Sequence, residues 1–218
     1  MTTRRQALKR IISWCAGGCV LGTQIGTGLR TAYAKTKRIV LPKGAPMSEL
    51  LNRNPAKLDT RNLATTPMDQ FDVMGQTIHP ANLKEWRLEM EGDIKHPQNM
   101  TYDALHRLPY IERNVLLICP GFFAYNGLWK GVDSAALVSQ VRPESGVTHI
   151  KFSGPKGIRR KTKKFPLQEF LTNKVFLAYQ VNGRPLPERH GFPLRLVAED
   201  YYGGRWVKYV DRISFVES

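Results

Sequence analysis

The chain has 218 residues, which is enough for one sizeable hydrophobic core. Its hydrophobic content of 42% and charged content of 23% are ordinary for a globular protein and argue against a disordered or low-complexity chain. The formal net charge of +15 favours anionic ligands and acidic partners, but it says little about the fold.

The first 34 residues have the pattern of a bacterial export signal. Arg4 and Arg5 precede a mildly apolar stretch over residues 11–29, and Ala32-Tyr33-Ala34 forms a small-x-small cleavage pattern. The paired arginines are typical of the twin-arginine route, which predicts a periplasmic protein. A membrane anchor is the alternative, but the many glycines make this stretch a poor span. We therefore expect no stable membrane span once the signal is removed.

Export also constrains the partners and the cysteines. Without residues 1–34 the chain keeps 28 basic and 18 acidic residues, so it stays basic. Nucleic acid is nevertheless not an expected partner, because export separates the chain from it. Cys15 and Cys19 leave with the signal, so Cys119 is the one remaining thiol and no internal disulfide framework is expected. The twin-arginine route carries folded proteins, which raises the expectation of a bound redox cofactor.

The segment after the signal, residues 35–80, has little periodicity and several Pro, Asn and Thr residues. We predict an irregular segment that wraps the surface. Apolar residues that alternate with charged ones predict a half-buried strand over residues 86–90, which ends at Gly92. A short helix is expected over residues 101–108, with Thr101 as its cap.

The middle of the chain combines a buried strand and a helix. The continuous apolar run over residues 115–118 predicts a fully buried strand that breaks at Cys119-Pro120-Gly121. Residues 134–141 predict a helix, with Asp133 or Ser134 as its cap.

The last third of the chain predicts further strands. They are expected to begin at Thr148 and to cover 175–181, 194–197 and 206–215, with a short helix over 166–171 and a turn at Asn182-Gly183. Because helices and strands mix without a regular βαβ rhythm, the sequence predicts an α+β domain with a mixed sheet.

The basic run over residues 159–164 has two interpretations. It could line the mouth of a site and steer an anionic substrate or an acidic electron-transfer partner. It could equally be a solvated surface loop, which is the usual interpretation of a charge run, and we favour the loop.

Cys119 is the first candidate for chemistry. It follows a buried strand and precedes Pro-Gly, so its thiolate is placed as a soft ligand for a transition metal. One thiolate cannot form a zinc or iron–sulfur site, so a metal here would need a cofactor to supply the other donors. On this residue alone, a buried structural cysteine is the simpler interpretation.

Two basic clusters follow, and each is suggestive by itself. In residues 186–197, Arg195 could make bidentate bonds to a phosphate. In residues 202–208, Gly203 and Gly204 could cradle a phosphate with backbone N–H groups. A basic surface turn is the alternative for both clusters.

Together these segments closely resemble the oxidoreductase molybdopterin-binding domain of the sulfite oxidase family, including its periplasmic methionine-sulfoxide reductase catalytic subunit. The resemblance extends from about Trp86 to Glu217 and predicts that residues 81–218 form this domain. It rests on five motifs in the family's order and spacing, namely Cys119 with 129–132, 177–187, 190–197, 202–204 and 207–208.

The resemblance implies a molybdenum-molybdopterin cofactor, with Cys119 as the metal ligand and a catalytic residue. Tyr125, in the Cys119 loop, is a second candidate for the catalytic pocket. The residues that match the family's cofactor contacts, or that fall near them, are Asp69, Asp72, Val73, Gly154, His190, Arg195, Trp206, Val207 and Lys208.

The chain departs from the sulfite oxidases at two places. Their Phe-Phe-x-Arg segment corresponds to residues 70–75, which contain no arginine. Their active-site Asp-Gly-Tyr is replaced by residues 153–157, and no tyrosine follows before Tyr179. Sulfite is therefore not the expected substrate.

The expected function is exported two-electron redox chemistry or oxygen-atom transfer on a small sulfur- or nitrogen-containing substrate. A separate haem protein or quinone-linked partner would exchange the electrons. One alternative is a non-catalytic, cofactor-containing or anion-binding module that acts with a redox partner. The other is a metal-free basic binding protein.

Overall fold

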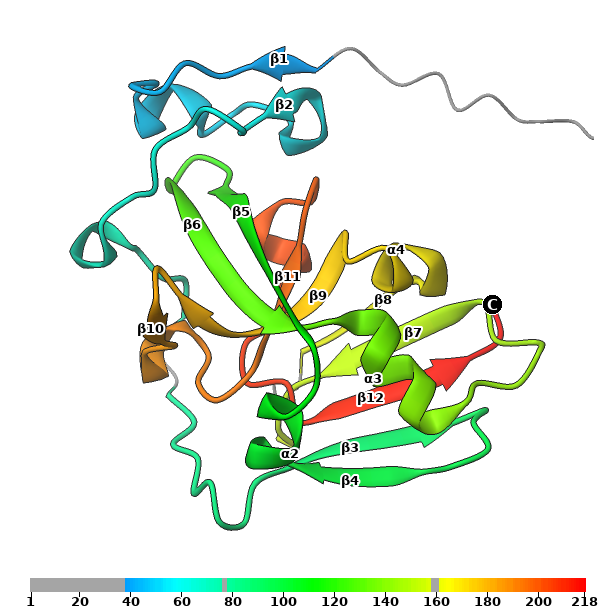
Figure 1. Cartoon of the computed structure of the whole chain (residues 1–218). Coiled ribbons are helices and arrows are strands. Elements are labelled where there is room, and N and C mark those ends of the chain that lie inside the picture. The colour runs from blue at the N-terminus through cyan, green and yellow to red at the C-terminus, as the bar shows by residue number, and fades with distance from the viewer. Residues whose placement is uncertain (1–37, 76–77, 158–160) are drawn as a thin grey trace, which may run out of the picture. The chain divides into compact units, whose positions relative to one another are not determined.

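The computed structural model describes residues 38–75, 78–157 and 161–218, so the predicted export signal lies outside the described residues. Two five-stranded sheets form the domain (Figure 1). The first sheet has the order β10-β9-β6-β5, and β11 also pairs with β9. Its strands are β5 (Tyr110–Cys119), β6 (Phe123–Val132), β9 (Val175–Val181), β10 (Arg184–Pro185) and β11 (Arg195–Ala198).

The second sheet has the order β4-β3-β12-β7-β8. Its strands β3 and β12 run parallel, whereas the other neighbours are antiparallel. The expected α+β class with a mixed sheet is therefore confirmed. The strands are β3 (Arg87–Gly92), β4 (Gln98–Thr101), β7 (His149–Ser153), β8 (Thr162–Pro166) and β12 (Arg212–Val216).

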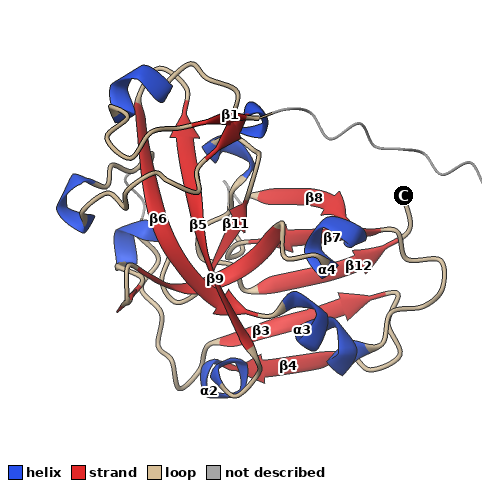
Figure 2. Ribbon diagram, turned by 45° about the horizontal axis from the view of Figure 1, so that its top comes forward, coloured by secondary structure: helices blue, strands red, loops and turns tan. Residues whose placement is uncertain are grey.

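Short helices connect the sheets, namely α2 (Tyr102–His106), α3 (Ser134–Val141) and α4 (Leu167–Leu171). The caps agree with the sequence: Thr101 Oγ1 accepts from Ala104 N at 3.1 Å, and Asp133 Oδ1 accepts from Ala136 N at 2.8 Å. Helix α4 lies against β7 and β8 of the second sheet and against β9 of the first, with α3 beside it (Figure 2). Among the described residues, no helix is long and apolar enough to cross a bilayer.

One core joins the two sheets. Side chains of the first sheet, such as Trp129 and Val181, belong to the same buried cluster as Leu88 and Ile213 of the second sheet. Leu137 of α3 is buried in the same cluster. Burial of this apolar surface is the main term that stabilises the domain.

The segment before the first long strand packs on the outer face of the first sheet. It contains β1 (Ile39–Val40) and β2 (Leu58–Asp59), which pair in parallel, and the 3₁₀ turns η1 (Met47–Leu50), η2 (Pro55–Lys57) and η3 (Met68–Gln70). Leu41, Leu50, Leu58 and Leu63 form a second buried cluster with residues of β5 and β6. The segment therefore covers a face of the sheet that would otherwise expose apolar side chains.

Strand β5 explains the continuous apolar run. Val115 and Leu117 point into the main core, whereas Leu116 and Ile118 point into the second cluster. Because both faces are buried, the run does not alternate. The prediction of a strand limited to residues 115–118 was too short, since the polar half from Tyr110 also pairs with β6.

The prediction of one strand over residues 206–215 was wrong. The turn η5 (Gly203–Arg205) leads into residues 206–210, whose backbone bonds instead to β11 and the residues before it: Leu196 N donates to Val207 O, and Val210 N donates to Leu194 O. Tyr209 has a φ of 58° and breaks the extended conformation. The strand of the second sheet therefore begins only at Arg212.

We predicted a solvated loop for the basic run over residues 159–164, and this prediction was wrong for the second half of the run. Residues 162–166 form β8, an edge strand that pairs with β7, while residues 158–160 lie outside the described residues. Lysines on an edge strand discourage pairing with another chain, which accounts for this composition in a strand.

The contact between β6 and β9 requires a glycine at position 131. A Cβ added to Gly131 would lie 2.0 Å from the backbone O of Leu177 on β9. We expect Gly131→Ala to lower the free energy of unfolding by about 2–3 kcal/mol, because the strands must separate. Urea unfolding measures this change. Gly44→Ala is the control, since nothing lies within 4 Å of its added Cβ. Equal urea midpoints for the two variants would show that β6 and β9 accommodate a Cβ at position 131 without loss of stability.

Candidate active site

Cys119 is the last residue of β5 and begins the turn into β6. The turn is closed by Phe122 N, which donates to Cys119 O at 3.0 Å, and Gly121 adopts a φ of 76° within it. The free thiol is half-buried. Burial raises the pKa of the Cys119 thiol, and the nearby Lys161 ammonium opposes that shift. The strand end thus presents a single sulfur toward a cavity.

The cavity beside Cys119 has a volume of about 260 Å³. Residues from six separate parts of the chain line it: the end of β5, the start of β6, the residue before β8, the start of β11, the η5 region and the segment after η3. The lining residues are Asp72, Val73, Met74, Leu117, Cys119, Phe123, Tyr125, Lys161, Arg195, Gly203, Gly204, Trp206 and Lys208. Three cations and one carboxylate therefore face the same space.

Arg195 is the buried cation of the cavity. Its side chain is 4% exposed, and Nη1 donates to His190 O at 2.9 Å. The guanidinium lies over the rings of Trp129 and Trp206 at 5.0 and 5.2 Å. Within the described residues it forms no salt bridge, and its Nε is buried without a hydrogen-bond partner. A buried charge without an anion is costly, so this geometry suits an anionic ligand.

His190 is buried against Tyr125 of the cavity wall but does not itself line the cavity. Its ring meets those of Phe71 and Tyr125 edge-on, at 5.9 and 6.4 Å, and Nδ1 is buried without a hydrogen-bond partner among the described residues. Burial, with the Arg195 and Lys208 cations, lowers the pKa of His190 to about 4. The ring is therefore neutral at neutral pH.

The buried histidine makes the fold sensitive to acid. In the unfolded chain a histidine titrates near 6.5, so between pH 6.5 and about 4 the unfolded state binds the extra proton. Stability is then complete above this window and falls as the pH drops through it. We expect wild type to lose about 2 kcal/mol relative to His190→Asn between pH 7 and 4. Urea unfolding of both proteins at each pH measures this, and parallel pH profiles would contradict it.

Lys208 ties two loops together at the edge of the cavity. Its Nζ donates to Met74 O at 3.2 Å and to Arg189 O at 3.1 Å. Burial, followed by the Arg195 and Lys161 cations, lowers the pKa of Lys208 to about 8. Gly191, with a φ of 110°, allows this approach, because an added Cβ would lie 3.1 Å from Lys208 Cα.

Tyr125 is stacked on Phe71 with ring centroids 3.9 Å apart. Burial raises the pKa of Tyr125, and Arg195 opposes the shift. The phenol therefore keeps its proton at neutral pH and has a hydroxyl at the cavity wall.

The structure brings most of the expected site residues together. Those that line the cavity are Asp72, Val73, Cys119, Tyr125, Arg195, Trp206 and Lys208. Four others do not line it: Asp69 is exposed on η3, Val207 is fully buried in the bridge to Leu196, His190 is buried against Phe71 and Tyr125, and Gly154 packs against the backbone of Lys208. Direct cofactor contact by any of these residues stays a prediction.

Sequence reasoning missed several lining residues, above all Lys161. The basic run over residues 159–164 was a signal for this lysine, but the sequence did not show that Lys161 within the run lines the cavity. Leu117 and Phe123 carried no signal because apolar residues in or beside a buried strand are ordinary core residues, and Met74 carried none because single exposed apolar residues are common on surfaces.

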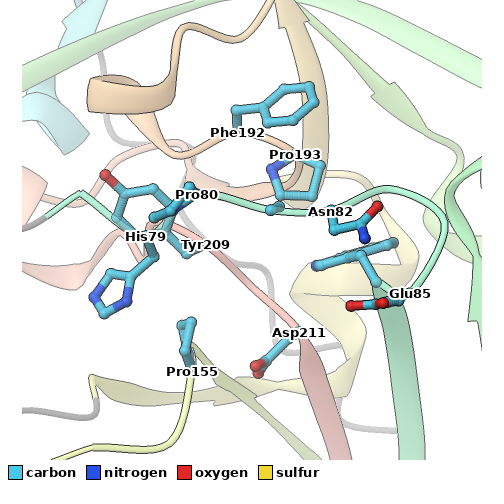
Figure 3. Close-up of a pocket in the computed structure, with 11 residues that line it drawn as sticks. His79, Pro80, Asn82, Glu85, Pro155, Phe192, Pro193, Tyr209 and Asp211 are labelled. Carbon is cyan, nitrogen blue, oxygen red and sulfur yellow. The ribbon is translucent and has the colours of Figure 1, made fainter.

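A second cavity, also of about 260 Å³, lies next to Tyr209 (Figure 3). Its wall includes Phe192 and Pro193 from the loop before β11, and two carboxylates, Glu85 and Asp211, contribute to it. Carboxylates repel a phosphate, so the phosphate of a cofactor fits the cationic cavity at Arg195 and Lys208 better than this one.

Comparison with known proteins agrees with this geometry. Residues 74–218 match the family described as the oxidoreductase molybdopterin binding domain. The chain is 26% identical over 144 residues to the uncharacterized oxidoreductase YuiH of Bacillus subtilis, covering 66% of this chain and 71% of that protein. It is 28% identical over 160 residues to the protein-methionine-sulfoxide reductase catalytic subunit MsrP of Gluconobacter oxydans, covering 66% of this chain and 50% of MsrP.

This chain covers smaller shares of other relatives. An NADH nitrate reductase of Phaseolus vulgaris is 29% identical over 170 residues, which cover 64% of this chain and 19% of the reductase. The crystal structure of the sulfane dehydrogenase SoxCD from Paracoccus pantotrophus has the same fold, with a TM-score of 0.66 and 20% identity, and covers all of this chain and 60% of that chain. Because the family match covers well over half of the sequence, the chain belongs to the oxidoreductase molybdopterin-binding domain family, the domain of sulfite oxidase type.

Proposed function

We propose that this chain uses Cys119 as its one protein ligand to the molybdenum of a molybdopterin cofactor and carries out two-electron redox chemistry or oxygen-atom transfer. The observation that carries the proposal is the shared cavity of Cys119 and Arg195, in which a sulfur faces a buried guanidinium without an anion. Among the described residues, no three His, Cys, Asp or Glu side chains converge on a metal position.

The cations and glycines of the cavity would hold the cofactor. Arg195 Nε is a buried polar atom without a partner among the described residues, so it can bond to a phosphate without giving up another contact. His190 Nδ1 is also without a partner there, but His190 does not line the cavity, so its contact with the cofactor would need the ligand to reach beyond the lining. Gly203 and Gly204 line the same cavity and leave room for backbone to approach a ligand. Lys208 keeps the segment at Met74 against the loop at Arg189 and so fixes one wall.

When bound, the molybdenum cofactor supplies the two-electron redox chemistry. The protein orients the substrate and excludes water. Leu117 and Phe123 give the cavity an apolar side beside the sulfur. Tyr125, a phenol that keeps its proton at neutral pH, can donate a hydrogen bond into the cavity. Asp72 is the one carboxylate among the lining residues and can accept a hydrogen bond from a ligand in the cavity.

The substrate we propose is a small sulfur- or nitrogen-containing molecule. A haem protein or quinone-linked partner would exchange the electrons, and the twin-arginine pattern of residues 1–34 supports export to the periplasm. The chain spans half of the length of MsrP and a fifth of the plant nitrate reductase, so the reactions of those whole proteins are not assumed.

Metal analysis with a substrate panel tests the proposal. The protein is purified from molybdate-fed cells, its molybdenum and pterin are measured, and turnover is followed with S-oxides, N-oxides and sulfite. We expect close to one molybdenum per chain and turnover of at least one substrate. Molybdenum without any turnover would favour the non-catalytic module, and protein free of both metal and pterin would favour a basic binding protein.

A further inference from the structure

The hairpin of β7 and β8 carries a lysine into the cavity. The paired ends of the strands, Ser153 and Thr162, are joined by a hydroxyl–hydroxyl hydrogen bond of 2.9 Å. One step further, Gly154 N donates to Lys161 O at 3.1 Å. The backbone of Lys161 is therefore fixed to the second sheet, and its side chain lines the cavity that holds Cys119 and Arg195.

Lys161 differs from the other two cations in what it contacts. Arg195 donates to His190 O, and Lys208 donates to the carbonyls of Met74 and Arg189, so both are engaged with the backbone. In the part of the chain that the structure describes, no salt bridge involves Lys161. Lys161 and Cys119 line the same cavity, and the Lys161 ammonium opposes the rise that burial causes in the pKa of the Cys119 thiol.

The surroundings of Lys161 favour an anion. Arg195 and Lys163 are its cationic neighbours, and one carboxylate, Asp72, lines the cavity. A cavity lined mainly by one sign of charge, with apolar walls such as Leu117 and Phe123, concentrates ions of the opposite sign. An ammonium in the same cavity as the sulfur can therefore receive a negatively charged group of a molecule that approaches Cys119.

We propose that Lys161 contacts an anionic group of the substrate and sets a preference for anionic over neutral substrates. The inference rests on the proposed function, since it concerns the substrate of the same site. Lys161 adds a cation to the cavity of a chain that lacks the arginine expected near residues 70–75. A charge-assisted hydrogen bond of this kind is worth roughly a 10- to 100-fold change in affinity.

The first test is anion binding without turnover. Sulfate is titrated into the molybdenum-loaded protein by calorimetry, with wild type, Lys161→Gln and Lys161→Arg compared. We expect sulfate to bind the wild-type protein and to bind Lys161→Gln at least about 10-fold more weakly. The affinity should be partly restored in Lys161→Arg. Lys164→Gln is the matched control, because it removes the same charge at an equally exposed residue three positions along the chain that does not line the cavity.

The second test separates charge from chemistry. Nitrate and sulfite are compared with the neutral acceptors dimethyl sulfoxide and trimethylamine N-oxide. We expect Lys161→Gln to raise the KM for anions about 10-fold or more while kcat and the KM for neutral substrates change less than 2-fold. Molybdenum content of each variant is measured alongside and should be unchanged.

Several outcomes would overturn the inference. Equal sulfate affinities in wild type and Lys161→Gln would do so, as would equal losses for Lys161→Gln and Lys164→Gln. A variant that changes only electron exchange with a protein partner would place Lys161 in partner docking instead. If the protein holds no molybdenum, the proposed function fails by itself, and sulfate titration still decides whether Lys161 binds an anion.

Discussion

Cys119→Ser is expected to reduce molybdenum content and to lower turnover by at least about 100-fold. Changes to residues that merely support a metal ligand already cost 10- to 100-fold, so loss of the ligand itself should exceed that range. Serine keeps the size of the side chain at the end of β5, and the half-buried position tolerates a hydroxyl. We therefore expect the urea midpoint to change little while metal, measured by elemental analysis, is lost.

Phe122→Ala is the matched control for this prediction. Phe122 occupies the same turn but is 67% exposed and does not line the cavity. It should retain both metal and turnover. Full activity in Cys119→Ser would refute the assignment of the sulfur as ligand, whereas equal losses in the two variants would show that the turn as a whole, and not the sulfur, matters.

Arg195→Met is expected to act in opposite directions on the cofactor-free and cofactor-loaded protein. In the loaded protein it leaves a buried phosphate without its cation, which should weaken cofactor retention by about 30- to 1,000-fold. In the cofactor-free protein it removes a buried charge that has no ion-pair partner among the described residues. The free energy of unfolding should then stay equal or rise by about 1 kcal/mol.

Cofactor release on dilution and urea unfolding measure the two effects separately. Arg184→Met, on the exposed strand β10, removes the same charge and should leave both unchanged. Arg195→Lys should retain the cofactor partly, because an ammonium lacks the planar fork of the guanidinium. A loss of more than about 2 kcal/mol in cofactor-free Arg195→Met would contradict the prediction, since Arg195 would then be a structural residue held by Trp129 and Trp206.

The sequence predicted elements best where the local signal is strong. The caps Thr101 and Asp133 and the strand over residues 175–181 agree with the structure. Strand β6 was not predicted, because Asn126, Gly127 and Gly131 disfavour a strand on propensity. Its partners β5 and β9 supply the hydrogen bonds and the packing that override that preference.

The candidate site followed the same division. Cys119, Arg195 and the segment at Trp206 were recognised because their motifs lie within short stretches of sequence. Lys161 was not, because its place depends on the pairing of β7 with β8 and on the bond from Gly154 N to its carbonyl. Asp69 on η3 and Val207 beside Leu196 do not line the cavity, although their neighbours Asp72 and Trp206 do, and their contact with a cofactor stays a prediction.

The sequence by itself determined the class of the domain, the thiol at Cys119 and the cations that would accompany it, because composition, caps and short motifs are local properties of the chain. Only the tertiary structure decided which of these residues share one cavity. Convergence of β5, β6, β11 and the η5 region around Cys119 depends on strand pairings between residues far apart in sequence. Those pairings are fixed by burial and backbone hydrogen bonding over the whole fold, which no local pattern specifies.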